Sequence, residues 1–261
     1  MADVETVDAT ASGLVLDLFA TICDATTDVL ARNDDWGWSG RRDTQYAVDL
    51  AMDDACVPPL HMAGYAVLSE ESGVTLPPGV ASVGDAAGVV VVDPLDGSTN
   101  AGLHVPWCAT SLCLVAGGEP TVAMVANLRT GDRYHAVAGA GAHLNGRRIT
   151  VGEECSLREA VVAVNGRPGD GFRPRQYRAM GATALDIAAV GRGDSFDGYL
   201  DADHDAVAVW DYLGALLVVR EAGGLIVDAD GRELVTLDPA ERRRPVAATS
   251  PGLLDELLLV S

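Results

Sequence analysis

The sequence predicts a layered sandwich of alternating helices and sheets, in the α+β or α/β class. Three features support this prediction. Two helical segments open the chain, a series of short strands separated by turn residues follows, and beyond about residue 155 strands and helices alternate. Nearly half of the residues (48%) are apolar, which is enough to form a sizeable core between such layers.

The N-terminal part of the chain contains two predicted helices and a short strand. Apolar residues recur at helical spacing over 10–31, at Leu14, Leu18, Ile22 and Val29. A second helix is predicted over 43–57, and it is expected to stop at Pro58-Pro59 because proline has no N–H group to donate. The apolar run 65–68 predicts a strand that ends just before a pair of glutamates.

An antiparallel meander is predicted in the middle of the chain. The apolar run 87–92 is typical of a buried strand, which Pro94 is expected to end. Further strand-like segments, separated by turn residues, cover 109–116, 121–127, 133–138 and 142–149. Asn145-Gly146 lies within the last of them, and this dipeptide strongly favours a tight hairpin turn.

Beyond residue 155 the sequence alternates between strand and helix patterns. Strands are predicted over 160–165, 197–201, 225–228 and 245–249, and helices over 173–179, 182–191, 210–222 and 251–259. The change in pattern divides the chain into an N-terminal α+β half, residues 1–155, and a C-terminal α/β half, residues 156–261. We expect the two halves to be tightly fused.

The composition argues against several classes of partner. The formal net charge is −20, and all 18 positions counted as Lys or Arg are arginine. Such acidity argues against wide contact with nucleic acid or with an anionic membrane, so neither is expected as a partner. The five cysteines form no C-x-x-C pair, and we expect reduced thiols. Without a signal peptide or a run of roughly 20 apolar residues, the expected location is the cytoplasm.

Residues 93–100, Asp-Pro-Leu-Asp-Gly-Ser-Thr-Asn, carry the strongest chemical signal. Asp93 and Asp96 lie three residues apart at the end of a predicted strand, and they repel each other unless a cation lies between them. Carboxylate and carbonyl oxygens are ligands that Mg²⁺ takes in proteins. The Gly-Ser-Thr that follows supplies backbone N–H groups where a helix begins, and a phosphate can bind there. The segment therefore predicts a metal and a phosphate side by side.

Other acidic residues stand near the ends of predicted elements. Asp49 lies on the second helix, Glu70 and Glu71 follow a strand, and Asp211 begins the helix predicted over 210–222. Each also has a purely structural interpretation: Asp211 as a helix cap, the glutamates as a solvated pair, and Asp49 as part of an exposed helix face. The five histidines show no spacing typical of metal ligands.

Taken in order, these segments resemble the inositol monophosphatase family. The similarity rests on Asp49, on Glu70-Glu71, on residues 93–99, and on Trp210-Asp211, which is followed after eleven residues by Gly223-Gly224. The resemblance covers about residues 10 to 255. It implies the layered fold of the inositol monophosphatases and fructose-1,6-bisphosphatases, an Mg²⁺-dependent and lithium-sensitive phosphatase activity, and a homodimer.

The resemblance also implies which residues hold metal. Glu70, Asp93 and the backbone carbonyl of Leu95 would hold one Mg²⁺, and Asp93, Asp96 and Asp211 would hold a second. Two such ions suit the reaction, because one lowers the pKa of a bound water from 15.7 toward roughly 7 and the other stabilises the leaving alkoxide.

Catalytic and binding roles follow from the same resemblance. Glu71, with Glu70, would lie where a weaker third ion and the attacking water bind. Asp49 and Ser98 would orient or deprotonate that water. The N–H groups of Gly97 and Ser98 would bind phosphate oxygens. The remaining expected substrate contacts lie further along the chain, at Gly181, Ala182 and Asp201. The alternatives to Asp201 are Asp203, His204 and Asp205.

The chain departs from the family pattern at three places. Several members carry a lysine in the loop before the second helix, where this chain has Trp36 and Trp38, and Arg41 or Arg42 is the candidate substitute. Ala208 stands where many inositol phosphatases have histidine. Ser98 replaces a more frequent threonine and keeps its hydroxyl. The first two departures leave the identity of the alcohol open.

The sequence therefore predicts an Mg²⁺-dependent phosphomonoesterase that acts on a small polyol or sugar phosphate, with inositol monophosphate as the leading substrate. Fructose-1,6-bisphosphatase and histidinol-phosphatase activities are alternatives on the same fold. A non-catalytic binding protein is a remote alternative, because every expected acid is present.

Overall fold

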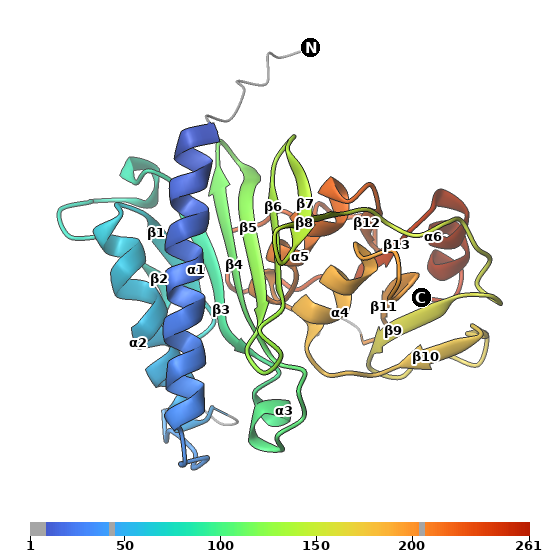
Figure 1. The fold of residues 1–261 in the computed structure, drawn as a ribbon, viewed down its shortest axis with the longest axis horizontal. Coiled ribbons are helices and arrows are strands. Elements are labelled where there is room, and N and C mark those ends of the chain that lie inside the picture. Colours follow the sequence, from blue (N-terminus) through green and yellow to red (C-terminus); the bar gives the residue numbers. More distant parts are fainter. Residues whose placement is uncertain (1–8, 42–44, 204–206) are drawn as a thin grey trace.

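The computed structural model describes residues 9–41, 45–203 and 207–261 of the chain. Helices and sheets alternate in five layers: a helix pair, an eight-stranded sheet, a second helix pair, a five-stranded sheet and a final helix (Figure 1). The predicted layered fold is confirmed. None of the helices within the described ranges combines the length and the apolar character that crossing a membrane requires.

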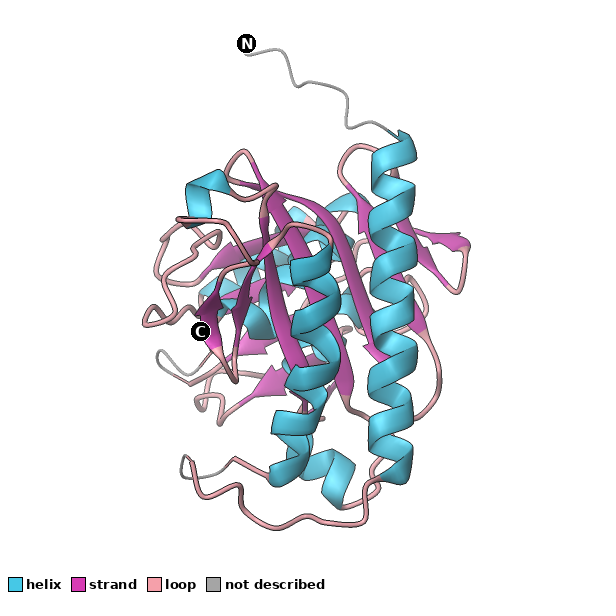
Figure 2. Cartoon of the chain, turned by 90° about the vertical axis from the view of Figure 1, so that its left-hand side faces the viewer, coloured by secondary structure: helices cyan, strands magenta, loops and turns pink. Residues whose placement is uncertain are grey.

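The outer helix layer consists of α1 (Ala9–Arg32) and α2 (Ala47–Met62), which lie across one face of the larger sheet (Figure 2). The predicted first helix is confirmed. Its core face carries Phe19 and Ile22, which pack against the sheet, whereas Leu14 is 68% exposed and does not belong to the apolar stripe.

Helix α2 does not stop at its prolines, so the predicted end is wrong. The helix continues through Pro58 and Pro59 to Met62. Each proline removes one helix hydrogen bond. Cys56 and Leu60, on either side of the prolines, are fully buried and pack against the sheet. Tertiary packing of this apolar face therefore holds the last turn in place against the local propensity.

The eight-stranded sheet has the strand order β2-β1-β3-β4-β5-β6-β7-β8. Its strands are β1 (Ala66–Ser69), β2 (Gly73–Thr75), β3 (Val89–Asp96), β4 (Ala109–Ala116), β5 (Glu119–Asn127), β6 (Arg133–Val137), β7 (Gly141–Leu144) and β8 (Arg147–Ile149). Strands β1 and β3 run parallel, β4 to β8 form the predicted meander, and β3 pairs antiparallel with β4. Strand β2 was not predicted. Asn145-Gly146 joins β7 to β8 with φ of 51° and 76°, which is the hairpin turn that the dipeptide predicts.

Strand β3 continues past Pro94 to Asp96, so the predicted end of this strand is wrong. The register with β4 shifts between Asp93 and Asp96, because Asp93 pairs with Ser111 and Asp96 with Ala109. Proline therefore interrupts the hydrogen-bond ladder without ending the extended chain. This irregularity places both aspartates at the end of one buried strand.

The five-stranded sheet has the order β10-β9-β11-β13-β12. Its strands are β9 (Val161–Asn165), β10 (Gln176–Arg178), β11 (Gly198–Asp201), β12 (Leu225–Asp228) and β13 (Pro245–Ala248). The predicted helix over 173–179 is wrong: this segment contains β10, an exposed edge strand parallel to β9. Pro174 precedes it, and the segment has no apolar helical face to bury.

Helices α4 (Thr183–Val190) and α5 (Val209–Glu221) fill the space between the two sheets, and α6 (Pro251–Leu258) covers the outer face of the smaller one (Figure 1). Short segments η1 (Val83–Asp85) and α3 (Ser98–Gly102) complete the described elements. Helix α5 is buried along nearly its whole length, so its first turn, which carries Asp211, is fixed from both sides.

Candidate active site

The parallel strands β1 and β3 bring Glu70 and Asp93 to the same edge of the larger sheet. Ser69 pairs with Val92 in the last residue pair of these two strands, so Glu70 and Asp93, which follow them, lie side by side. The N–H of Glu70 donates to the carbonyl of Val92 at 3.2 Å, which fixes the chain at this point. These two acids are therefore neighbours although they are distant in the sequence.

Asp93 is buried among other carboxylates. Only 1% of its surface is exposed, and its Oδ1 accepts a hydrogen bond from the N–H of Leu95 at 3.0 Å. Burial raises the pKa of Asp93 well above its usual range, and the charges of Glu70, Asp96 and Asp211 raise it further. This mutual repulsion means that carboxylates from β3, from the end of β1 and from α5 share one region.

Asp96 connects the end of β3 to the first turn of α4. Its Oδ1 accepts a hydrogen bond from the N–H of Thr183 at 3.2 Å, and its Oδ2 accepts one from Ala184 at 2.7 Å. Burial raises the pKa of Asp96 to about 7, with a smaller contribution from Glu70, while the two hydrogen bonds act in the opposite direction. Asp96 is thus held across the boundary between the larger sheet and the inner helices.

Gly97 brings two backbone segments into contact next to this cluster. Its φ is 79°, a conformation that favours glycine. A Cβ at this position would lie 3.0 Å from both the carbonyl oxygen of Gly181 and the Cβ of Ala182. The structure therefore brings three predicted substrate contacts together, and the fourth, Ser98, follows as the first residue of α3.

Asp211 both stabilises the start of α5 and belongs to the acidic cluster. It is not the N-cap residue, which is Ala208; instead, as the third residue of the helix, it accepts a hydrogen bond at its Oδ2 from the N–H of Ala208 at 2.6 Å. Burial raises the pKa of Asp211 to about 8, and the charge of Asp96 adds to the rise. A smaller contribution from Asp201 shows that this residue, too, lies near the cluster.

Asp49 and Glu71 are held by the segment just before α2. Asp49 is only 5% exposed, so its interpretation as part of an exposed helix face is wrong. Its Oδ2 accepts a hydrogen bond from the N–H of Tyr46 at 2.8 Å. The side-chain amide of Gln45 donates to Glu71, which is partly buried and not part of a freely solvated pair.

Asp201, at the end of β11, is fully buried, and its two carboxylate oxygens differ in their hydrogen bonding. Its Oδ1 accepts hydrogen bonds from the N–H of Asp203 at 3.0 Å and from the amide of Asn165 at 3.3 Å. Its Oδ2 has no hydrogen-bond partner within the described ranges. Burial raises the pKa of Asp201 to about 7. Of the alternatives to Asp201, Asp203 is exposed, and His204 and Asp205 lie outside the described residues.

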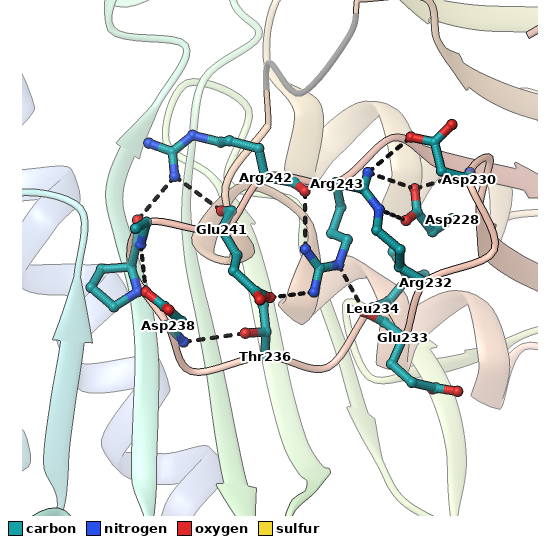
Figure 3. A network of polar contacts seen from close by, with 12 residues as sticks. Asp228, Asp230, Arg232, Glu233, Leu234, Thr236, Asp238, Glu241, Arg242 and Arg243 are labelled. Carbon is teal, nitrogen blue, oxygen red and sulfur yellow. Dashed lines mark hydrogen bonds and ion pairs between the residues drawn. The ribbon is translucent and has the colours of Figure 1, made fainter.

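Arg242 is a member of this region that the sequence did not predict. Its guanidinium lies over the ring of Trp210, 5.6 Å from the ring centroid. It donates to the carbonyls of Pro239 and Glu241 at 2.9 and 3.0 Å (Figure 3). Its positive charge opposes the rise in the pKa of Asp211. The guanidinium of the neighbouring Arg243, in contrast, forms an ion pair with Glu241. The run of three arginines in a chain without lysine is the signal that could have drawn attention to it.

Two further polar residues scaffold the region and were also missed. The amide of Asn100 donates to the carbonyls of Met180 at 2.7 Å and Trp107 at 2.8 Å, which ties α3 to the segment before α4. Asp186 is 2% exposed and accepts a hydrogen bond from the Trp107 indole at 2.8 Å. Burial raises the pKa of Asp186 well above its usual range.

The chemistry of the acidic cluster fits a hard divalent cation. Every donor is an oxygen, and a cation would relieve the repulsion that raises the pKa values. Within the described ranges, however, no three His, Cys, Asp or Glu side chains are arranged so that they could hold a metal ion as they stand. Asp93, Asp96 and Asp211 each accept hydrogen bonds from backbone N–H groups. A bound cation would compete with those donors.

Fold and site together define a class, the phosphatases built from alternating helix and sheet layers. The sequence model described as "Inositol monophosphatase family" matches residues 3–260. The chain belongs to this family and is a phosphoric ester hydrolase.

Known relatives agree with this assignment. A fructose-1,6-bisphosphatase/inositol-1-monophosphatase from Thermococcus kodakarensis is 37% identical over 218 residues, which are 82% of this chain and 81% of the relative. An inositol-1-monophosphatase from Rhizobium meliloti is 39% identical over 155 residues, or 54% of this chain and 57% of the relative. A solved structure from Pyrococcus horikoshii, described as having similarities to inositol-1 monophosphatase, superimposes with a TM-score of 0.81 over 97% of this chain and 98% of its own. At 24% identity this last match establishes the fold.

Proposed function

We propose that the chain is an Mg²⁺-dependent phosphomonoesterase that hydrolyses a small polyol or sugar phosphate, with inositol monophosphate as its leading substrate. The observation that supports this most is that Glu70, Asp93, Asp96 and Asp211 lie in one region. There the negative charge of one carboxylate disfavours the ionisation of its neighbours. Such a concentration of carboxylates is unfavourable alone and favourable around divalent cations. A phosphomonoester dianion needs the same cations, because phosphoryl transfer depends on charge neutralisation and positioning.

In this proposal, Glu70, Asp93, Asp96, Asp211 and the carbonyl of Leu95 hold two or three Mg²⁺ ions. When bound there, the ions supply an activated water at neutral pH and charge stabilisation for the leaving alkoxide. Asp93 is the natural shared ligand, because the charges of the other three acids all act on it.

The chain's own groups orient the reactants. Asp49 and Ser98 orient or deprotonate the attacking water, and Glu71, held by Gln45, acts beside them. The backbone N–H groups of Gly97 and Ser98 donate to phosphate oxygens. The tight contact between Gly97 and the 181–182 segment supports this role, because it fixes the backbone at the start of α3.

Asp201 is the proposed contact to the hydroxyl groups of the substrate. Its buried Oδ2 has no hydrogen-bond partner within the described ranges, and a hydroxyl donor would satisfy it. This arrangement favours a polyol over an alcohol without further hydroxyls. Gly181 and Ala182 would line the path between phosphate and polyol.

Fructose-1,6-bisphosphatase activity is the second candidate, and one observation favours it. Arg242 places a cation next to Trp210-Asp211, and within the described ranges it forms no ion pair with an acid. A second phosphate on the substrate could bind such a guanidinium. The Thermococcus relative carries both activities in its name.

A substrate panel tests the proposal directly. Phosphate release would be measured from inositol 1-phosphate, fructose 1,6-bisphosphate and histidinol phosphate, with Mg²⁺ and with EDTA. We expect turnover only with Mg²⁺, fastest on inositol 1-phosphate, and its loss in Asp93→Asn. Absence of turnover on all three esters would contradict the proposal, and activity in EDTA would contradict its metal dependence.

Inhibition by Li⁺ and a homodimer are proposed on the family resemblance alone. From the sequence we also propose a cytoplasmic location and no nucleic-acid or membrane partner. The net charge of −20 supports the last point. Phosphate release with added Li⁺ and light scattering of the purified protein test the first two.

A further inference from the structure

Three aromatic side chains, Trp36, Trp38 and Tyr46, form a column beside the proposed site. The rings of Trp38 and Tyr46 are stacked, with centroids 4.7 Å apart and planes inclined by 13°. Trp36 meets Tyr46 edge-on at 5.8 Å. At the other end, the Trp36 ring packs on Gly102 of α3, where a Cβ would lie 3.1 Å from it. The column therefore runs from the helix that begins at Ser98 outward to Trp38.

Trp38 ends this column, and within the described ranges Tyr46 is the one ring stacked on it. Its inner face rests on Tyr46, and 63% of its surface is exposed. A single exposed apolar side chain is ordinary on a protein surface. Trp38 differs because its orientation is fixed: Trp38 and Tyr46 form an antiparallel bridge, flanked by backbone hydrogen bonds from Ser39 to Gln45 at 2.8 Å and from Ala47 to Gly37 at 2.9 Å.

The same paired segment is attached to the acids that the proposed function assigns to the attacking water. The side chain of Gln45 donates to Glu71, and the N–H of Tyr46 donates to Asp49. Ser39, the residue after Trp38, donates from its hydroxyl to Gln45 at 2.5 Å. A short set of hydrogen bonds thus connects the segment that carries Trp38 to Glu71 and Asp49, next to the acidic cluster.

The geometry points to Trp38 as a specificity-determining residue, whose outer face stacks against a flat ring in the alcohol part of the phosphate ester. This inference rests on the proposed function and narrows its substrate class to esters of ring-bearing alcohols. Two kinds of ring present the required face: a cyclitol or sugar, through its C–H groups, and a heteroaromatic ring, through its π system. An acyclic polyol has neither.

Steady-state kinetics would test this with three esters: inositol 1-phosphate, histidinol phosphate and glycerol 3-phosphate. In Trp38→Ala we expect KM for at least one ring-bearing ester to rise about fivefold to tenfold, with kcat changed by less than about twofold. KM for glycerol 3-phosphate should stay unchanged, and Trp38→Phe should recover most of the loss. The ring-bearing ester that loses more identifies the kind of ring. Tyr177→Ala, at an aromatic residue 54% exposed on β10, is the matched control and should change nothing.

An equal rise in KM for all three esters would overturn the inference, because it would mean that Trp38 only supports the fold of the segment.

Indole N–H signals in NMR provide a second readout that needs no turnover. The chain has four tryptophans, and the signal absent from Trp38→Phe belongs to Trp38. That signal should shift when a ring-bearing ester is added with Mg²⁺, and not with glycerol 3-phosphate. An unmoved Trp38 signal in a protein that hydrolyses ring-bearing esters refutes the stacking while the proposed function stands. Absence of phosphate release from every ester refutes the proposed function instead, and the NMR shift still decides the role of Trp38.

Discussion

Replacing Asp93 by asparagine should stabilise the metal-free protein at alkaline pH while abolishing activity. The folded state raises the pKa of Asp96 from 3.8 to about 7 and that of Asp211 from 3.8 to about 8. A carboxyl group whose pKa rises on folding binds its proton more tightly in the folded state. The stability gained in this way is fully present below the unfolded pKa, and it is lost as pH rises through the folded pKa. Between about pH 5 and about pH 8 the loss is on the order of 3 kcal/mol for each group, so metal-free protein should become less stable over this range.

Asp93→Asn removes a carboxyl group whose pKa is raised by burial and by its acidic neighbours, and which therefore costs the folded state stability at alkaline pH. We expect the variant to exceed the wild type in free energy of unfolding by about 1–2 kcal/mol in EDTA at about pH 8, and to show a weaker dependence on pH. Mg²⁺ should reverse the order, because wild-type protein gains about 2.7 kcal/mol at a Mg²⁺ concentration of 100 Kd and the variant gains less.

Urea denaturation with EDTA or Mg²⁺, at the two pH values, measures both effects. Asp17→Asn, at an exposed position on α1, is the matched control and should leave stability and its pH dependence unchanged. The reasoning is refuted if Asp93→Asn is less stable than the wild type in EDTA at the higher pH, or if Mg²⁺ stabilises the two proteins equally.

Three other substitutions test separate parts of the site. Gly97→Ala should lower the unfolding free energy by about 1–2 kcal/mol and reduce kcat. The reason is that φ at this position is 79° and the new Cβ would lie 3.0 Å from the Gly181 carbonyl oxygen. An unchanged melting curve would contradict this. Arg242→Gln should lower the Mg²⁺ concentration for half-maximal activity about threefold to tenfold, since it removes a positive charge near Asp211, and a higher requirement would speak against that placement. Asp201→Asn should raise KM for inositol 1-phosphate with little effect on kcat, whereas an effect on kcat alone would point to a role in the chemical step.

Local patterns in the sequence were sufficient for much of the fold. The spacing of apolar residues predicted α1, and Asn145-Gly146 fixed a hairpin because both residues adopt positive φ. Predictions failed where tertiary packing outweighs a local preference. The prolines of α2 lie on a helix whose Leu60 is buried against the sheet, and the segment that contains β10 pairs with β9 along a register that no local pattern encodes.

The candidate site shows the same division. Ordered acidic segments indicated Asp93 and Asp211 as members of one site, and the structure brings both into one region. Arg242 could not be assigned to it from the sequence, because only the packing of the segment before β13 over Trp210 brings its charge there. The burial of Asp49 likewise depends on tertiary packing, because the spacing of acids along α2 does not show which face of the helix meets the rest of the fold.

A crystal structure with Mn²⁺ in place of Mg²⁺ and with inorganic phosphate tests the central claim most directly. Anomalous scattering from Mn²⁺ locates each ion independently of the protein chain. The account predicts ions bound by Glu70, Asp93, Asp96 and Asp211, with phosphate at the N–H groups of Gly97 and Ser98. Mn²⁺ bound elsewhere, with none of those four carboxylates as a ligand, would contradict it.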